Sequence, residues 1–174
     1  GYAERLRSEH RIPVFVHEAD AARARGEIKP KTSMGKVRIR PLIRFLWYAG
    51  RRGGLRTTYL REVQTFRGGE TLDLPGSPRV IPMPGHSPGS VAFHVPSVDA
   101  VFVGDALTTR DVLTGAGGPR PAPFTDDPDG AAASLEALEA LDAHWVLPGH
   151  GPPWEGGSAE AVRRYRAAVA AAAS

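Results

Sequence analysis

Three residues with metal-binding side chains follow short apolar runs that end in glycine-containing turns. His86 stands in Pro-Gly-His-Ser-Pro-Gly-Ser, Asp105 ends Val-Phe-Val-Gly-Asp, and His150 ends Trp-Val-Leu-Pro-Gly-His. Imidazole nitrogen and carboxylate oxygen bind Zn²⁺ at roughly 2.0 to 2.2 Å, and a catalytic zinc keeps one coordination position free for water. The trio suits that chemistry, but three side chains are too few for two metal ions.

Each of these residues alone also has an ordinary structural explanation. A histidine in a Pro-Gly turn is commonly an exposed or hydrogen-bonded residue, and Asp105 could equally cap a turn or a helix. Only the three together, at the ends of three apolar runs, favour a metal site. For the remaining histidines we expect structural roles: His10, His17, His94 and His144.

The second half of the chain contains the elements that must position the trio. Short β-branched and apolar runs, interrupted by Pro, Gly and Ser, predict strands over Arg79–Met83, Ser90–Val95, Ala100–Val103 and Trp145–Leu147. An acidic start with Pro128 predicts a helix after Asp126, with its apolar face formed by Leu135, Leu138 and Leu141. A final alanine-rich helix is expected over Ser158–Ala173.

The first half of the chain predicts a less regular arrangement. Apolar spacing indicates helices over Ala3–His10, Glu18–Arg25 and Ile39–Ala49, and a strand over Pro13–His17. A strand, Gly-Gly turn and strand pattern predicts a hairpin that joins Val63–Phe66 to Thr71–Leu74.

Composition limits the class of protein. The chain has 174 residues and 41% hydrophobic content, which is enough for one domain with a real core. It contains no cysteine, so disulfides and thiolate ligands are excluded, and nothing in the sequence indicates an oxidising compartment. No apolar run approaches the length of a membrane span. We therefore expect a soluble, cytoplasmic protein without a membrane partner.

Positive charge is concentrated in one segment of the chain. Residues 29–67 contain 11 of the 22 Lys and Arg residues, while Glu62 is their only acid. Such a segment could meet phosphate, an anionic lipid surface or an acidic substrate, or it could be a solvated helix and loop whose arginine stems lie over apolar surface. We interpret residues 29–56 as a basic insertion or lid within the domain.

The three motifs, in this order and separation, resemble the C-terminal metal motifs of the metallo-β-lactamase-fold hydrolase superfamily. The residues that carry the resemblance are Pro-Gly-His-Ser-Pro-Gly-Ser at His86, Phe-Val-Gly-Asp-Ala-Leu at Asp105 and Leu-Pro-Gly-His-Gly at His150. Residues 12–26 also resemble the segment that follows the first metal motif of that family. The resemblance implies an α/β fold, the αββα sandwich of the superfamily.

The first metal motif of the family, His-x-His-x-Asp-His, does not occur in this sequence. In family members it is followed within a few residues by Gly-Gly and a helix that resembles Tyr2–Glu9. We therefore interpret residues 1–174 as a single partial domain, the C-terminal piece of a longer enzyme, rather than as a member that has lost its ligands. Part of the first sheet would then be absent as well.

The resemblance also implies a role for each residue of the trio. His86 would be the third imidazole on a first metal, Asp105 the carboxylate that bridges two metals, and His150 a ligand of the second metal. The family mechanism is hydrolysis by a metal-bound hydroxide at an ester, thioester or lactone carbonyl. The expected cofactors are two divalent ions, Zn²⁺ first, with Mn or Fe as alternatives. Without the missing motif we expect this chain alone to be inactive.

Asp105 narrows the subgroup within the superfamily. Zinc β-lactamases usually carry Cys or Ser at the corresponding position, whereas thioester, lactone and phosphodiester hydrolases carry Asp. A small-molecule substrate of a glyoxalase II-like or lactonase-like enzyme is therefore expected. Two other functions stay open: a phosphodiesterase or nuclease that uses the basic segment on nucleic acid, and a non-catalytic binding module with this fold.

Overall fold

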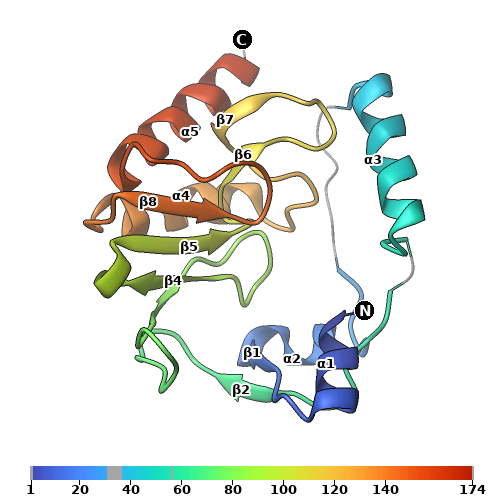
Figure 1. The fold of residues 1–174 in the computed structure, drawn as a ribbon. Coiled ribbons are helices and arrows are strands. Elements are labelled where there is room, and N and C mark those ends of the chain that lie inside the picture. The colour runs from blue at the N-terminus through green and yellow to red at the C-terminus, as the bar shows by residue number, and fades with distance from the viewer. Residues whose placement is uncertain (1, 31–36, 56, 174) are drawn as a thin grey trace.

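A computed structural model of the protein describes residues 2–30, 37–55 and 57–173 (Figure 1). Its elements, in chain order, are α1 (Tyr2–His10), β1 (Phe15–His17), η1 (Glu18–Asp20), α2 (Ala21–Ala24), α3 (Ile39–Arg51), β2 (Gln64–Phe66), β3 (Arg79–Pro82), β4 (Val91–Val95), η2 (Pro96–Val98), β5 (Ala100–Gly104), β6 (Thr108–Arg110), β7 (Gly117–Arg120), α4 (Pro128–Glu139), β8 (Trp145–Pro148) and α5 (Ser158–Ala173). The predicted α/β class is confirmed.

A four-stranded sheet forms the centre of the molecule, with the strand order β3-β4-β5-β8. Strand β4 is antiparallel to both β3 and β5, and β8 is parallel to β5. It follows that β3, β5 and β8 all run in the same direction, so their carboxyl ends lie at one edge of the sheet. The four strands predicted from the second half of the sequence are all confirmed.

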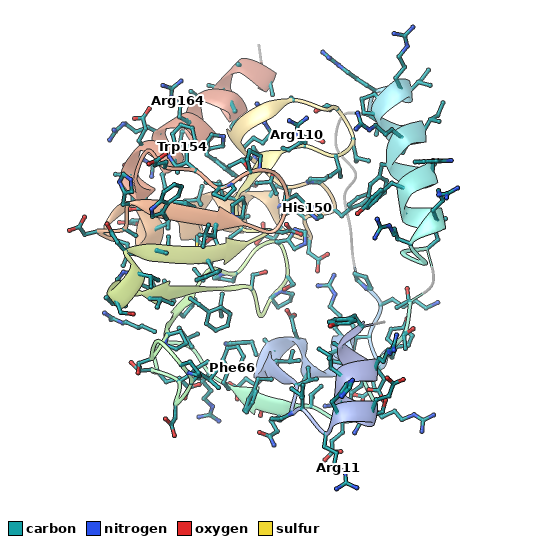
Figure 2. The ribbon with its side chains drawn as sticks, viewed as in Figure 1. Arg11, Phe66, Arg110, His150, Trp154 and Arg164 are labelled. Atoms are coloured by element: carbon teal, nitrogen blue, oxygen red, sulfur yellow. The ribbon has the colours of Figure 1, made fainter. Side chains whose placement is uncertain are left out.

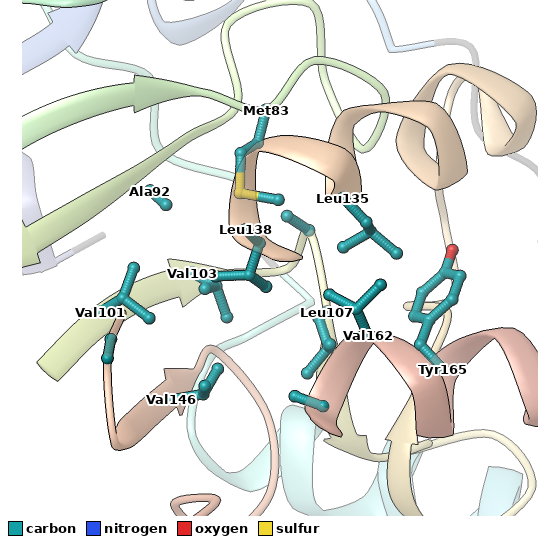
Figure 3. Close-up of a cluster of buried hydrophobic side chains, with 13 residues drawn as sticks. Met83, Ala92, Val101, Val103, Leu107, Leu135, Leu138, Val146, Val162 and Tyr165 are labelled. Carbon is teal, nitrogen blue, oxygen red and sulfur yellow. The ribbon is translucent and has the colours of Figure 1, made fainter. Parts of the chain in front are cut away.

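The main hydrophobic core lies between this sheet and the helices α4 and α5 (Figure 3). Alternation along β5 shows how the sheet contributes, because Val101 and Val103 are buried whereas Phe102 between them is 45% exposed. The helices contribute Leu135 and Leu138 from α4, as predicted, and further side chains from α5. The buried members of the core are Met83, Ala92, Val101, Val103, Ala106, Leu107, Leu135, Leu138, Ala143, Val146, Ala161, Val162 and Tyr165.

Helix α4 begins where the acidic run of the sequence predicts a helix. The Asp127 side chain accepts a hydrogen bond from the backbone N–H of Gly130 at 2.9 Å, and Pro128 occupies the first turn. This cap satisfies one of the N–H groups that every helix start leaves unpaired. Helix α4 is thereby fixed beside the loop that contains His86, because the N–H of Asp127 also donates to the carbonyl of Gly85 at 2.9 Å.

The N-terminal part of the chain forms a separate small sheet in which β1 and β2 pair in parallel. The predicted hairpin between Val63–Phe66 and Thr71–Leu74 is therefore wrong. The N–H of Gly69 instead donates to Val80, and the N–H of Val80 donates to Glu70, at 2.9 and 2.8 Å. The Gly-Gly pair permits this path, because a Cβ on Gly68 would lie 2.3 Å from Pro82.

Two other local predictions need correction. The single helix expected over Glu18–Arg25 is a 3-10 turn followed by the one-turn helix α2. The hairpin of β6 and β7 was not predicted, since its strands are short and contain the breaker residues Gly117, Gly118 and Pro119.

The helix expected within the basic insertion is confirmed as α3, which stands apart from the sheet in Figure 1. Residues 31–36 and 56 of that insertion lie outside the described residues, and its role as a lid stays a prediction. Among the residues that the structure describes, no helix is long and apolar enough to cross a membrane.

Candidate metal centre

The three residues predicted as metal ligands follow the three strands that share one direction. His86 lies four residues after β3, Asp105 directly follows β5, and His150 lies two residues after β8. Since the carboxyl ends of these strands meet at the same edge of the sheet, the fold brings side chains that are 64 residues apart in sequence to one place.

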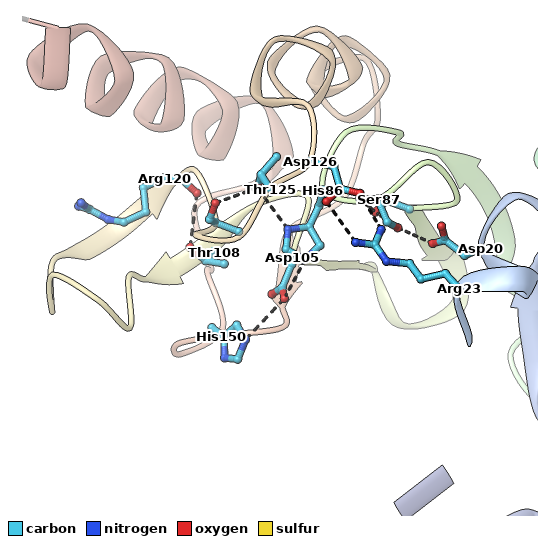
Figure 4. Close-up of polar contacts among 12 residues, drawn as sticks. Asp20, Arg23, His86, Ser87, Asp105, Thr108, Arg120, Thr125, Asp126 and His150 are labelled. Carbon is cyan, nitrogen blue, oxygen red and sulfur yellow. Dashed lines mark hydrogen bonds and ion pairs between the residues drawn. The ribbon is translucent and has the colours of Figure 1, made fainter. Parts of the chain in front are cut away.

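Asp105 is the centre of this group (Figure 4), and Figure 2 shows where His150 lies in the whole molecule. The Oδ2 atom of Asp105 lies 3.5 Å from Nε2 of His150 and 3.7 Å from Nε2 of His86. The His86 and Asp105 side chains are 24% and 26% exposed, whereas that of His150 is 46% exposed. The group is thus held on one side by the loops around it and is open on the side of His150.

A glycine next to His150 makes the close approach to Asp105 feasible. A Cβ on Gly149 would lie 2.4 Å from Oδ1 of Asp105, a distance that no real side chain tolerates. The N–H of Gly149 also donates to the carbonyl of Gly104 at 2.7 Å, which joins the ends of β5 and β8. The absence of a side chain at Gly149 therefore allows the turn before His150 to pack directly against the Asp105 carboxylate.

Thr125 fixes the orientation of the His86 ring. Its hydroxyl donates to the carbonyl of Ala122 at 2.8 Å, and the same oxygen lies 3.2 Å from Nδ1 of His86. A hydroxyl has one hydrogen, so Thr125 accepts from Nδ1–H and leaves the lone pair on Nε2. This is the tautomer in which Nε2 can bind a metal ion.

The pKa values of Asp105 and His150 shift in opposite directions. Burial raises the pKa of Asp105, but its hydrogen bond to the His150 imidazole and the electrostatic attraction of the two nearby imidazoles outweigh burial, so the pKa lies below its ordinary 3.8. The contact with Asp105 raises the pKa of His150 above its ordinary 6.5, against a smaller opposing effect of burial. In the absence of a metal ion, each of the two groups therefore stabilises the charged form of the other.

The chemistry of these donors fits a bound cation. Oδ1 of Asp105 is buried and has no hydrogen-bond partner, and Nε2 of His86 directs a lone pair toward the same carboxylate. Electron-rich atoms that face one another are stabilised by a positive ion between them. Even so, among residues 2–30, 37–55 and 57–173 no group of three or more His, Cys, Asp or Glu residues could hold a metal ion unaided. The assignment of the trio as ligands stays a prediction.

Two polar contacts connect the N-terminal region to the His86 loop (Figure 4). The Ser87 hydroxyl donates to Oδ2 of Asp20. The Arg23 guanidinium donates twice to the Asp126 carboxylate, at 2.7 and 3.1 Å, and both side chains are less than one quarter exposed. We call these four residues the polar clamp.

The polar clamp supports the loop from both sides. The N–H of Asp126 donates to the carbonyl of His86 at 3.3 Å, so the residue that holds Arg23 also holds the backbone of the predicted ligand. Close packing adds to this, because a Cβ on Gly89 would lie 2.8 Å from the carboxyl carbon of Asp20.

Sequence reasoning missed the members of the polar clamp and Thr125. The sequence pattern predicts Asp126 only as part of a helix start and Ser87 only as part of a turn. The Asp-Asp-Pro-Asp run was the one available signal, because it contains more carboxylates than the cap of a single helix needs.

Two of the other histidines have the local contacts expected of structural residues. Nδ1 of His17 accepts from the N–H of Ala19 at 3.2 Å, and its ring packs edge-on against Phe66. His144 packs edge-on against Trp145. His94 lies within β4, and His10 is the last residue of α1.

Comparison with known sequences gives one profile match and two curated relatives. The profile of the metallo-β-lactamase superfamily matches residues 1–150. A hydroxyacylglutathione hydrolase from Hyphomonas neptunium is 50% identical over 42 residues, which is 24% of this chain and 16% of the relative. A hydroxyacylglutathione hydrolase from Ruegeria pomeroyi is 39% identical over 84 residues, 47% of this chain and 30% of the relative. The matched part is less than one third of either relative.

The solved structures that resemble the chain over most of its length include two with the same TM-score. The metallo-β-lactamase family protein TTHA1429 from Thermus thermophilus is 22% identical with a TM-score of 0.60, over 91% of this chain and 53% of that protein. The structure of TTHA1623 in a di-iron-bound form is 28% identical with a TM-score of 0.60, over 95% of this chain and 69% of that one. The first of these likenesses, at such low identity, shows a shared fold.

Proposed function

Because the chain belongs to the metallo-β-lactamase superfamily, we propose that it supplies His86, Asp105 and His150 to the metal centre of a metal-dependent hydrolase. The predicted superfamily fold is confirmed by the solved structures that resemble it. One observation carries the proposal: three strands of common direction bring the trio together around a buried carboxylate oxygen that has no partner.

Each residue has a distinct task in this proposal. Asp105 offers both carboxylate oxygens, His86 offers Nε2 because Thr125 occupies its Nδ1–H, and His150 offers its more exposed imidazole. A divalent ion bound there would polarise a substrate carbonyl and lower the pKa of water. His150 is the most exposed of the three side chains, so a substrate would approach the trio from its side.

Three side chains do not complete a two-metal site, so the proposal requires further ligands. The His-x-His-x-Asp-His residues of the superfamily would supply them, and without them we expect the chain to bind metal weakly and to be inactive. Zn²⁺ suits two imidazoles and a carboxylate, and the di-iron form of TTHA1623 makes iron the first alternative.

A thioester is the substrate class that the relatives favour. Both curated relatives are hydroxyacylglutathione hydrolases, whose name describes a thioester of glutathione. The longer of the two matches covers 47% of this chain. A thioester therefore comes first, before esters and lactones, and a cytoplasmic location is consistent with such a substrate.

The test uses the complete gene product, with whatever residues its gene places before Gly1. We expect about two equivalents of divalent metal by elemental analysis, and metal-dependent hydrolysis of a hydroxyacylglutathione. Asp105→Ala should remove both, whereas His94→Ala, a substitution within β4, should retain both. Circular dichroism of both variants checks that they fold.

Three results would contradict the proposal. The first is full metal content in Asp105→Ala. The second is a gene whose product lacks any further ligand motif and binds no metal, which would favour a non-catalytic binding module. The third is hydrolysis of phosphodiesters with none of thioesters, esters or lactones, which would assign the site to a phosphodiesterase.

A further inference from the structure

Among the described residues, those that hold helix α3 to the rest of the protein lie along one of its sides. The Phe45 ring packs against Phe124 with 6.4 Å between ring centroids, and the N–H of Arg38 donates to the carbonyl of Leu113 at 3.1 Å. Ala49, one helical turn after Phe45, is the only residue of α3 that is buried. This inner side holds α3 beside the β6–β7 hairpin and the segment that leads to Thr125.

The outer side of α3 exposes large apolar side chains that no other part of the described chain covers. Ile39, Ile43 and Leu46 follow one another at intervals of four and three residues, and Trp47 lies four residues after Ile43, so all four lie on one side of the helix. Their exposed fractions are 76%, 61%, 44% and 63%. An apolar stripe of this kind, rather than a single exposed residue, indicates a surface that binds something.

Arginines line the edge of that stripe. Arg40, Arg44 and Arg51 follow one another at intervals of four and seven residues and are exposed. The Arg51 guanidinium lies 5.1 Å from the centroid of the Trp47 ring, and that of Arg52 lies 5.5 Å from the Tyr48 ring. The polar edge of the helix is therefore wholly cationic and is interleaved with aromatic rings.

The charge of the surrounding segment is equally one-sided. Residues 29–67 hold 11 basic residues and one acid, a net charge of +10, while the rest of the chain holds 11 basic residues and 18 acids, a net charge of −7. No acid occurs between residues 28 and 61. The partner of the α3 outer face must therefore combine negative charge with an apolar interior.

We propose that the outer face of α3, formed by Ile39, Ile43, Leu46, Trp47 and the three flanking arginines, lies on the surface of an anionic lipid bilayer. A basic edge beside Trp and aliphatic residues is the composition of helices that lie in the membrane interface. Anionic lipid complements the arginines, and the acyl region accepts the apolar stripe. The expectation of no membrane partner rested on the absence of a spanning segment, which an interfacial helix does not need.

A second copy of the chain is the weaker alternative. Two copies that met through this face around a two-fold axis would gather the three arginines of each copy at one interface. Like charges at an interface oppose association, whereas an anionic surface favours it. Charge therefore favours the anionic bilayer over a second copy, since the apolar stripe alone could contact both.

The proposal is tested by sedimentation of the purified protein with vesicles at low salt. With vesicles that contain about one third phosphatidylglycerol in phosphatidylcholine, we expect binding that weakens as salt rises. With phosphatidylcholine alone, binding should fall about tenfold or more. Trp47 should report the same event, because its fluorescence shifts to shorter wavelength as the ring leaves water.

Two sets of variants assign the binding to α3. The triple change Arg40→Gln, Arg44→Gln and Arg51→Gln should weaken binding to anionic vesicles about tenfold or more, given the contribution of each cation near such a surface. A matched control makes the same charge change elsewhere, at Arg5, Arg79 and Arg163. These control arginines are exposed and lie on α1, β3 and α5. Ile43→Asn tests the apolar part. Circular dichroism confirms that each variant is folded.

Three outcomes would overturn the proposal. One is no binding to anionic vesicles at low salt by the folded protein. Another is equal loss of binding in the α3 triple variant and in the control triple variant. The third is a dimer in light scattering that Ile43→Asn converts to a monomer, because the outer face would then belong to a second copy. This test does not measure hydrolytic activity. A negative result for membrane binding therefore leaves the proposed function unaffected.

Discussion

Residues 79–173 bury a continuous core, whereas between residues 2 and 66 the structure describes only Ala21, Ala49 and Phe66 as buried apolar residues. The first region packs sheet against helices. The second exposes many large apolar side chains, among them Tyr2, Ile12, Ile28 and those of α3. Since burial of apolar surface is the dominant source of stability, the two regions must differ in how firmly they are held.

The predicted ligands belong to the firmly held region, but one of them also depends on the other region. Asp105 and His150 follow adjacent parallel strands of the main sheet. His86 lies in a longer loop that Arg23 and Asp20 of the N-terminal region support through the polar clamp. The comparison therefore predicts that changes in the two regions affect stability and metal affinity in different proportions.

The largest effect should come from the core. Leu138 is fully buried between α4 and the sheet, so Leu138→Ala should lower the free energy of unfolding by about 2 to 5 kcal/mol. Leu46→Ala removes the same atoms from a residue of α3 that is 44% exposed, and should change stability by less than about 0.5 kcal/mol. Urea denaturation of both variants measures the difference. Equal losses would show that α3 is as well packed as α4.

A clash at the edge of the main sheet should have the next largest effect. Gly149→Ala would place a Cβ 2.4 Å from Oδ1 of Asp105, and relief of such overpacking costs about 1 to 3 kcal/mol. Metal affinity, measured by titration, should fall as well because Asp105 must move. Gly117→Ala is the matched control, since nothing lies within 4 Å of its added Cβ. If Gly149→Ala bound metal normally, Asp105 would not need its present position.

The polar clamp should affect metal binding more than stability. Arg23→Gln removes the bidentate contact to Asp126 and should weaken metal affinity about tenfold, as is usual for residues that orient a ligand. Arg25→Gln breaks the more exposed pair with Glu27 and should leave affinity unchanged. The absorption spectrum of bound Co²⁺ reports ligand geometry directly, so it should change in the first variant alone. Partial rescue by Arg23→Lys would support a positioning role.

The sequence predicted most of the well-packed region and little of the clamp, for a physical reason. Strands β3, β4, β5 and β8 have local patterns, because apolar runs stop at glycine and proline. The trio could be selected from its place at the ends of such runs. The three residues converge because β3, β5 and β8 run in the same direction, and the direction of a strand within the sheet cannot be predicted from that strand's own residues.

Contacts between distant segments were not predictable in the same way. Arg23 and Asp126 are 103 residues apart, and the residues around either one do not identify the other as its partner. The Gly68-Gly69 pair has the pattern of a hairpin turn, yet tertiary packing against Pro82 decided its path. Local chemistry thus predicted where ligands stand, while the residues that orient them became visible only in the fold.

The smallest effect should be the pH dependence of stability after metal is removed by chelation. Contact with Asp105 raises the pKa of His150 above 6.5, so its contribution is complete below that value and is lost as pH rises through the raised pKa. The lowered pKa of Asp105 gives a contribution that is present above 3.8 and lost as pH falls through the lowered pKa.

Both contributions to stability are therefore present together only between these two limits. Thermal unfolding of the wild type and of His150→Gln should differ most between pH 3.8 and 6.5 and converge as pH rises through the raised pKa of His150, since the neutral imidazole no longer attracts the carboxylate. Stability of the N-terminal region should not follow this profile, which hydrogen exchange resolved by region can verify. A difference that stayed constant across this range would mean that Asp105 and His150 do not share a proton, and that the open edge of the sheet is held by packing alone.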